Sequence, residues 1–280
     1  MIVPQLFQTP AGVVRAGPDG WVLIEGDLTL DAAIRANGVG ELCARPGRPV
    51  DPVDQIFLPP LAPNRLILVG FNYESHATEV GVAIPSDLVF RVSEPSPGVV
   101  VGSGARVPLP PEAPGQVDYE GEIAVVIGRR ASKVSESEAA AVVAGITACI
   151  DLSARDVLRA AAQKGGPHDP GVVGSKMYTG FNPLGPGLIV LSSAELRSPD
   201  LRLQTWVNGE LRQSATAADM IFSILRCVAE ISASVELHPG DVISTGTPAG
   251  VGFPTQRFLV RGDTVSVQVG PLPPLSITVQ

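Results

Sequence analysis

Three acidic side chains alternate along the seven-residue stretch VDYEGEI at 117–123, immediately before an apolar run. Asp118, Glu120 and Glu122 are each two positions apart, and side chains two apart lie on the same face of an extended strand. We therefore expect their oxygens to converge on one side of the strand. A cation should balance them there, because several buried negative charges together are costly.

Another carboxylate, Asp151, stands where the apolar segment 146–150 stops. Three oxygen donors from Glu120, Glu122 and Asp151 are what a hard divalent cation requires, so Mg²⁺, Mn²⁺ or Ca²⁺ would suit this set and Zn²⁺ would not. The alternative is structural: the two glutamates lie on the solvated face of an edge strand, and Asp151 helps to cap a helix.

His76 and Glu79 are three positions apart, which makes them neighbours on a helical turn. In that arrangement the carboxylate can orient the imidazole and stabilise its protonated form, a device for taking a proton from water. The alternative is an ordinary surface contact.

Composition limits the class of protein. The chain of 280 residues is 45% hydrophobic and 17% charged, which is typical of a globular protein with its own core. A net charge of -8 with scattered arginines argues against nucleic-acid binding. Three widely spaced cysteines predict no disulfide framework, and the longest apolar run, 139–150, is too short to span a bilayer. We expect a soluble cytoplasmic protein.

The pattern of strands and turns predicts an α+β fold that is mostly β, with mixed sheets and a few flanking helices. Residues 1–62 are interpreted as a small β-rich segment with a proline-rich linker, and residues 63–280 as the catalytic domain. Asn208-Gly209 predicts a two-residue hairpin turn. Further expectations are strands at 21–24, 66–70, 122–127, 242–245, 258–260, 264–269 and 275–279, a helix at 30–36, and helices starting at Ser135, Ser153 and Thr216.

An ordered set of short motifs closely resembles the fumarylacetoacetate hydrolase (FAH) superfamily over roughly residues 65–255. The set comprises Val69-Gly70-Phe71-Asn72-Tyr73 followed by His76, then 117–124, 151–156, Lys176, 183–186, 207–213, 219–222 and 239–250. The resemblance implies an FAH-type β-roll fold and a homodimer.

The resemblance also implies roles for individual residues. Glu120, Glu122 and Asp151 match the family's metal-binding carboxylates. His76 and Glu79 match the lid pair that positions or deprotonates water, and Lys176 matches the lysine beside the substrate's oxygens. Tyr73, Arg155 and Thr247 match positions that hold the substrate or an intermediate.

Several positions depart from the family pattern. Ile150 and Leu158 stand where Asn and Gln are usual, Met177 follows the lysine, and Phe90-Arg91-Val92-Ser93 replaces a Phe-x-Lys-Pro segment. A thinner polar shell favours a larger or more apolar substrate over a small diacid. The glycine- and proline-rich stretch 165–171 is either a solvent loop or a flap bearing His168.

The function that the resemblance implies is metal-dependent cleavage of a C–C bond beside a ketone, by hydrolysis of an acylpyruvate or 1,3-diketone through a metal-stabilised enolate, with Mg²⁺ as the expected ion. One alternative is a decarboxylase or keto–enol tautomerase (isomerase) of a 2-keto or β-keto acid, which shares the enolate. The other is a non-catalytic FAH-like binding protein. Retained acidic residues argue against the latter, because a decayed site has no physical reason to keep them together unpaired.

Overall fold

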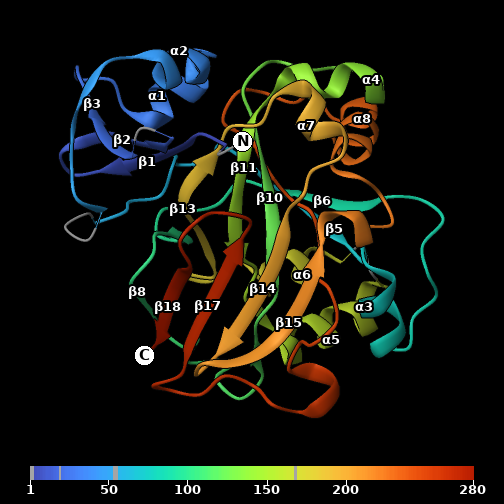
Figure 1. Cartoon of the computed structure of the whole chain (residues 1–280). Helices are drawn as coiled ribbons and strands as arrows, with labels where there is room; N and C mark the ends of the chain where they lie inside the picture. The colour runs from blue at the N-terminus through green and yellow to red at the C-terminus, as the bar shows by residue number, and fades with distance from the viewer. Residues whose placement is uncertain (1–2, 19, 53–55, 167–168) are drawn as a thin grey trace.

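The computed structural model describes residues 3–18, 20–52, 56–166 and 169–280 (Figure 1). Within them the fold is mixed α+β, as the sequence predicts, and two large sheets dominate it. His168 lies outside the described residues. Among the described residues, no helix has both the length and the apolar character that a bilayer crossing requires.

The largest sheet runs in the order β4-β3-β2-β1-β13-β11-β10-β16-β5-β6, and β7 pairs with β13. Its strands are β1 Gln5–Thr9, β2 Gly12–Gly17, β3 Gly20–Ile24, β4 Gly47–Pro49, β5 Leu66–Gly70, β6 Val89–Ser93, β7 Val100–Val101, β10 Gly121–Ile127, β11 Val143–Ile150, β13 Asn182–Ile189 and β16 Val242–Ser244.

The second sheet runs in the order β15-β14-β17-β18-β8, and a two-stranded ladder joins β12 to β9. These strands are β8 Ala105–Val107, β9 Val117–Asp118, β12 Ser153–Ala154, β14 Arg202–Val207, β15 Glu210–Thr216, β17 Thr264–Val269 and β18 Leu275–Val279. The helices are α1 Leu30–Arg35, α2 Val39–Ala44, α3 Glu74–Glu79, α4 Glu136–Ala139, α5 Arg155–Gly165, α6 Pro170–Gly174, α7 Ser193–Arg197 and α8 Ile224–Ser234.

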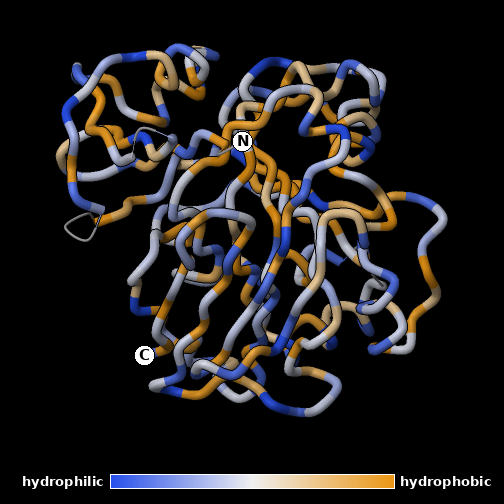
Figure 2. The backbone as a smooth tube through the Cα atoms, in the orientation of Figure 1, coloured by the Kyte–Doolittle hydropathy of each residue, from blue (hydrophilic) through white to orange (hydrophobic). Residues whose placement is uncertain are grey.

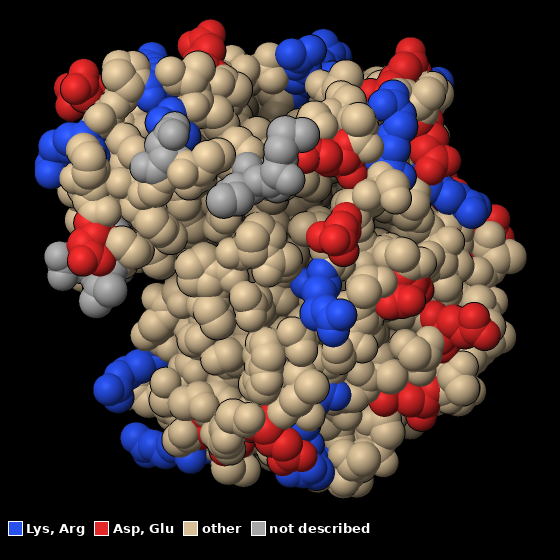
Figure 3. Space-filling model, in the orientation of Figure 1, with Lys and Arg blue, Asp and Glu red and all other residues tan. Residues whose placement is uncertain are grey.

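One hydrophobic cluster lies between the two sheets, and a second one contains Ala124 and Val126 on the opposite face of β10. Strand β10 is buried along its whole length because both of its faces are covered, and this explains its uninterrupted apolar run. Ile123 and Val125 of β10 belong to the same hydrophobic cluster as Leu203 of β14 and Val267 of β17. Figure 2 shows hydrophobic residues concentrated in these central strands, and Figure 3 shows surface charges of both signs interspersed on the viewed face.

The N-terminal strands β1–β4 form one end of the largest sheet, and with helices α1 and α2 they lie to one side of the remaining strands in Figure 1. They are joined to the rest through the antiparallel pairing of β1 with β13, in which Gln5 faces Ile189. Phe7 stacks on Trp21 and lies against Phe57, so the proline-rich segment contributes an aromatic side chain to the packing of this lobe.

The predicted hairpin is confirmed: β14 and β15 are joined at Asn208 and Gly209, whose φ angles of 52° and 78° are the left-handed values that such a turn needs.

The predicted start of a helix at Thr216 is wrong. The Thr216 cap closes only a 3₁₀ turn, Ala217–Asp219, and α8 begins at Ile224 with Ser223 as its N-cap. The buried Asn72 side chain accepts from the Phe222 N–H and keeps this segment out of a helix.

Two further expectations are wrong. Residues 258–260 form no strand, because Leu259 makes only a single backbone hydrogen bond, to Val117. Ser153 does not cap α5: its backbone pairs with Asp118 in the β12–β9 ladder, and Ala154 occupies the N-cap position. In both cases the tertiary environment of Val117 and Asp118 overrides a local signal.

Candidate metal centre and cavity

Glu120, Glu122 and Asp151 converge, as the sequence predicts. Glu120 lies in the two-residue connection between β9 and β10, Glu122 lies in β10, and Asp151 follows β11, which pairs antiparallel with β10. The Asp151 N–H donates to the Glu120 carbonyl at 2.8 Å and holds these two segments of the chain together. One carboxylate oxygen of each residue lies within 4.8 Å of the others, and all three residues are buried.

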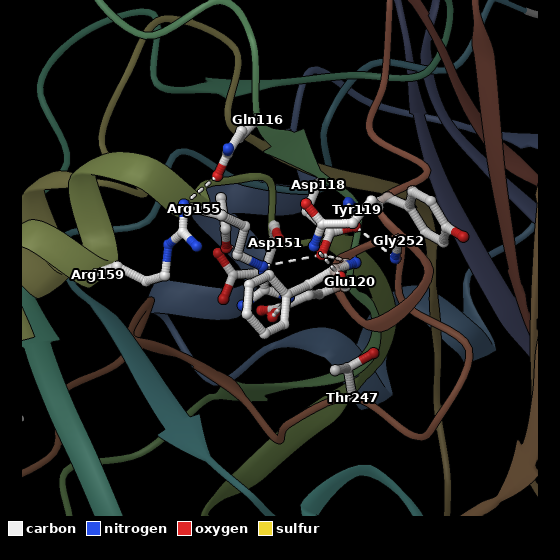
Figure 4. A network of polar contacts seen from close by, with 12 residues as sticks. Gln116, Asp118, Tyr119, Glu120, Asp151, Arg155, Arg159, Thr247 and Gly252 are labelled. Carbon is white, nitrogen blue, oxygen red and sulfur yellow. Dashed lines mark hydrogen bonds and ion pairs between the residues drawn. The ribbon is translucent and has the colours of Figure 1, made fainter. Parts of the chain in front are cut away.

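Asp118 does not join this cluster, so the expectation that all three alternate acids converge is wrong. Asp118 and Glu122 belong to different strands: Tyr119 and Glu120 lie outside both, and β9 pairs with β12 whereas β10 pairs with β11 and β16. Asp118 instead accepts hydrogen bonds from Arg155 Nε at 2.8 Å and from the Gly252 N–H at 2.7 Å. Its cation is therefore an arginine (Figure 4).

Two cations of the chain face the cluster. Lys176 Nζ donates to Glu120 Oε2 at 2.6 Å and to Asp151 Oδ2 at 2.5 Å, and Arg155 Nη2 lies 2.6 Å from Glu120 Oε1. Burial by itself would lower the pKa of Lys176, but the neighbouring Asp151 and Glu120 carboxylates raise it above its ordinary value. Lys176 therefore carries a positive charge.

These cations do not neutralise the site. Asp118, Glu120, Glu122 and Asp151 carry four negative charges when ionised, against two positive charges on Arg155 and Lys176. The uncompensated charge is that of one divalent cation. Burial, followed by the Asp151 and Glu120 charges, raises the pKa of Glu122 well above its usual value, which is the electrostatic signature of this excess.

The donor set fits a hard divalent ion. Asp151 Oδ1 is buried and has no hydrogen-bond partner among the described residues, although buried carboxylate oxygens are normally satisfied. Burial raises the pKa of Asp151 to about 6, against the opposing effect of Lys176. An ion held by one oxygen from each of Glu120, Glu122 and Asp151 would satisfy this atom and supply the missing charge.

A buried glutamine fixes the segment between the two glutamates. Gln213 Oε1 accepts from the Gly121 N–H at 2.9 Å, and Gln213 Nε2 donates to Thr247 Oγ1 at 2.7 Å and to the Pro248 carbonyl at 2.8 Å. Thr247 Oγ1 in turn donates to the Gly121 carbonyl at 2.9 Å. Gln213 thus holds the Gly121 N–H directly and the Gly121 carbonyl through Thr247, so it sets the relative position of Glu120 and Glu122.

We expect Gln213→Leu to weaken metal binding about 10- to 100-fold, because loss of groups that orient the ligands has effects of this size. Isothermal titration calorimetry with Mn²⁺ measures the change. Gln204→Leu, a half-buried glutamine on the neighbouring strand β14, is the matched control. Unchanged affinity in Gln213→Leu would show that the clamp does not position the ligands.

Close packing at Gly121 gives a second prediction. A Cβ added there would meet Thr205 Oγ1 at 2.0 Å, so Gly121→Ala should lower the free energy of unfolding by about 1–3 kcal/mol through overpacking. Chemical denaturation measures this loss. Thr205→Ala in the same chain removes the clashing oxygen and should restore most of the stability; an equally unstable double variant would refute the steric explanation.

His76 and Glu79 are also in contact through their side chains. Both lie on α3, with His76 Nδ1 2.9 Å from Glu79 Oε1, and the imidazole stacks on Phe71. Glu79 additionally accepts from the Gly250 N–H at 2.9 Å, which joins α3 to the turn that carries Thr247. His76 is buried at 5% exposure and lines the same cavity as the carboxylates, so the pair is not an ordinary surface contact.

Tyr73 and Thr247 are placed differently. Thr247 lines the cavity, but its hydroxyl hydrogen is used by the Gly121 carbonyl. Tyr73 is fully buried beside the cavity rather than in its lining, and its hydroxyl has no partner among the described residues. Burial, and then the charge of Glu122, raises the pKa of Tyr73 far above its usual value, so the phenol stays protonated.

The cavity above the carboxylates has a volume of about 380 Å³. Its floor is polar and its walls are apolar. Leu158, in place of a polar residue, belongs to these walls, whereas Ile150 and Met177 do not line the cavity; the wall residues include Val80, Val82, Val89, Leu158, Val172 and Phe253. Sequence reasoning missed Gln213, Phe253 and Arg159. Arg159 follows Arg155 by one helical turn, a spacing from which it could have been found.

Comparison with known proteins agrees with this geometry. The family model for the fumarylacetoacetate (FAA) hydrolase C-terminal domain matches residues 65–280. Oxaloacetate tautomerase YisK of Bacillus subtilis is 38% identical over 220 residues, which are 78% of this chain and 70% of that protein.

Two solved structures are similar over nearly their whole length. The 5-carboxymethyl-2-hydroxymuconate delta-isomerase from Mycobacterium smegmatis has a TM-score of 0.72 and 32% identity, covering 100% of this chain and 98% of that one. Fumarylacetoacetate hydrolase (EaFAH) from Exiguobacterium antarcticum has a TM-score of 0.76 and 25% identity, covering 100% and 99%. The chain belongs to the fumarylacetoacetate hydrolase superfamily.

Proposed function

We propose that this chain is a divalent-metal-dependent keto–enol tautomerase or isomerase that acts on a 2-keto acid. The observation that carries the proposal is the buried carboxylate cluster, with its uncompensated charge and its unpartnered Asp151 oxygen, on the floor of a cavity that also contains His76. Relatives named as a tautomerase and as isomerases favour this chemistry over C–C hydrolysis.

The bound metal would supply Lewis-acid stabilisation of negative charge on a substrate oxygen. Lys176 adds a second positive centre at the same place. An ammonium has three N–H donors, and Lys176 uses two of them on Glu120 and Asp151, so the third is left for the substrate. Lys176 therefore orients the 2-keto oxygen and stabilises the enolate charge that develops on it.

The chain also supplies an acid–base group. Glu79 binds Nδ1 of His76, and Nε2 makes no hydrogen bond with a described residue. In tautomerisation the proton on the carbon next to the ketone passes to His76 Nε2. The electron pair of the broken C–H bond forms the C=C bond, and the carbonyl oxygen takes up the negative charge. Return of a proton to that oxygen gives the enol, and reversal of the steps gives the ketone.

Hydrolysis of an acylpyruvate or diketone is the second candidate, and the His76–Glu79 pair favours it, because a carboxylate-oriented imidazole can also take a proton from water. Decarboxylation would need the metal and Lys176 but no activated water. All three reactions use the same enolate, so the product decides among them.

The test is to incubate the Mg²⁺-loaded protein with oxaloacetate and, separately, with an acylpyruvate. The loss of the enol is followed by ultraviolet absorbance, and the products are identified by NMR. We expect faster keto–enol exchange that chelation abolishes, with oxaloacetate left intact. Pyruvate formed from oxaloacetate would establish decarboxylation instead, and cleavage of the acylpyruvate at a higher kcat/KM than tautomerisation would establish a hydrolase.

A further inference from the structure

Asp118 is a fully buried carboxylate that is not one of the three clustered oxygen donors and does not line the cavity. Its Oδ1 accepts from the Tyr119 N–H at 2.9 Å and from the Gly252 N–H at 2.7 Å. Its Oδ2 accepts from the Phe253 N–H at 3.0 Å and from Arg155 Nε at 2.8 Å. Each carboxylate oxygen has about two lone-pair sites, so these donors fill both oxygens. Asp118 therefore acts on the site only through the groups that it holds.

The Asp118 carboxylate is itself held by the backbone. Three of its donors are backbone N–H groups, and two of these come from the turn at Gly252 and Phe253. The Arg257 N–H closes this turn by donating to the Gly252 carbonyl at 2.9 Å. A Cβ at Gly252 would lie 2.7 Å from Asp118 Oδ1, so glycine permits the close approach. The carboxylate is thus a fixed acceptor for the one side chain that binds it.

That side chain, Arg155, is shared between two carboxylates (Figure 4). Its Nε is bound to Asp118, and its Nη2 lies 2.6 Å from Glu120 Oε1. A guanidinium often binds a single carboxylate through two parallel hydrogen bonds, which are among the strong polar contacts of proteins. Because Asp118 takes the Nε donor, this nitrogen is not available to Glu120. The other oxygen of Glu120 already accepts from Lys176 at 2.6 Å.

We propose that Asp118 is a positioning residue of the metal centre, which retains Arg155 Nε and so prevents a two-bond pair between Arg155 and Glu120. This inference rests on the metal centre of the proposed function. A metal ion competes with the cations that hold its ligands, so a firmer pair between Arg155 and Glu120 lowers the metal affinity. Asp118 thereby keeps Glu120 available as an oxygen donor without contact to the ion.

The first test is titration calorimetry of the full chain with Mn²⁺. We expect Asp118→Ala to weaken binding about 10- to 100-fold, the usual cost of losing a group that orients a metal ligand. Asp118→Ser is the second variant, with the same expected result: its hydroxyl supports the turn, but one oxygen cannot serve all the donors of a carboxylate. Differential scanning calorimetry in EDTA checks that both variants are folded. Asp156→Asn, a half-buried aspartate whose Oδ1 accepts from the Val157 N–H, is the control and should leave the affinity unchanged.

The second test separates position from charge, because both variants also remove one negative charge. Crystal structures of the folded variants in EDTA should show Arg155 Nε and Nη2 both within hydrogen-bond distance of Glu120. Weaker Mn²⁺ binding with Arg155 unmoved would assign the loss to charge alone and overturn the proposal, and so would an unchanged Mn²⁺ affinity. Both results would leave the proposed function intact. A wild type that binds no Mn²⁺ would overturn the metal centre and this inference with it.

Discussion

Glu122→Gln is expected to weaken Mn²⁺ binding by about 100-fold or more and to reduce kcat/KM by a roughly similar or larger factor. Glu122 lies in the central strand β10, where Ser244 Oγ donates to its Oε2 at 2.6 Å and the Gly246 N–H donates to the same oxygen at 2.8 Å. These donors fix the carboxylate toward the cluster. Glutamine keeps its shape but removes the charge that attracts the metal.

The same substitution should stabilise the metal-free protein. The pKa of Glu122 is raised in the folded state by burial and by Asp151 and Glu120. Ionisation of Glu122 therefore lowers the free energy of unfolding. That destabilisation develops as the pH rises above the unfolded-state pKa and is fully present above the raised folded-state pKa. Glu122→Gln removes it, and the Tm in EDTA should rise by roughly 2–4 °C per kcal/mol gained.

Titration calorimetry measures the metal affinity, and differential scanning calorimetry in EDTA measures the Tm. Glu112→Gln, an exposed glutamate outside the cluster, is the matched control and should change neither. A Glu122→Gln protein that binds Mn²⁺ like the wild type, or that has a lower Tm without metal, would show that the carboxylates do not form a strained metal site.

His76→Asn is expected to separate chemistry from metal binding. His76 lines the cavity but is not one of the three oxygen donors, so metal affinity should stay within about twofold of the wild type. Tautomerisation should fall by about 10²–10⁴, the usual contribution of a positioned acid–base group. Asparagine removes the ring nitrogen that faces the cavity and retains a polar side chain of smaller size.

Enol decay under saturating Mg²⁺ measures this loss, and calorimetry measures the metal affinity in parallel. His238→Asn, on a histidine paired with Glu236 at the protein surface, is the control. Full activity in His76→Asn would move the acid–base role to another group, with Lys176 the next candidate. Retained decarboxylation together with lost tautomerisation would show that only proton transfer at carbon needs the imidazole.

The sequence predicts those parts of the fold that local chemistry determines. Asn208-Gly209 specifies the hairpin because few other residues accept the left-handed backbone angles of its turn, and the uniform apolar run specifies β10 because both of its faces are covered. Prediction from the sequence fails where hydrogen bonds to residues far away in the chain compete with the local pattern. Asn72 captures the Phe222 N–H, which delays α8 until Ser223 although the cap at Thr216 is intact.

Some residues of the candidate site could likewise be predicted from the sequence, and others could not. Glu120, Glu122 and Asp151 could be grouped from motif spacing, and antiparallel pairing of β10 with β11 explains why they meet. Asp118 could not be separated from them, because the break between β9 and β10 at Tyr119 and Glu120 does not show in an alternating pattern. Gln213 acts through contacts with Gly121 and Thr247, which are remote from it in the chain, and no local pattern marks such pairs.

The most direct test of the central claim is an anomalous difference map from crystals grown with Mn²⁺. We predict one strong peak in the cavity, about 2.1 Å from one oxygen each of Glu120, Glu122 and Asp151, with Asp151 Oδ1 now satisfied. A map without a peak at this position, with Lys176 still bridging Glu120 and Asp151 in saturating Mn²⁺, would contradict it.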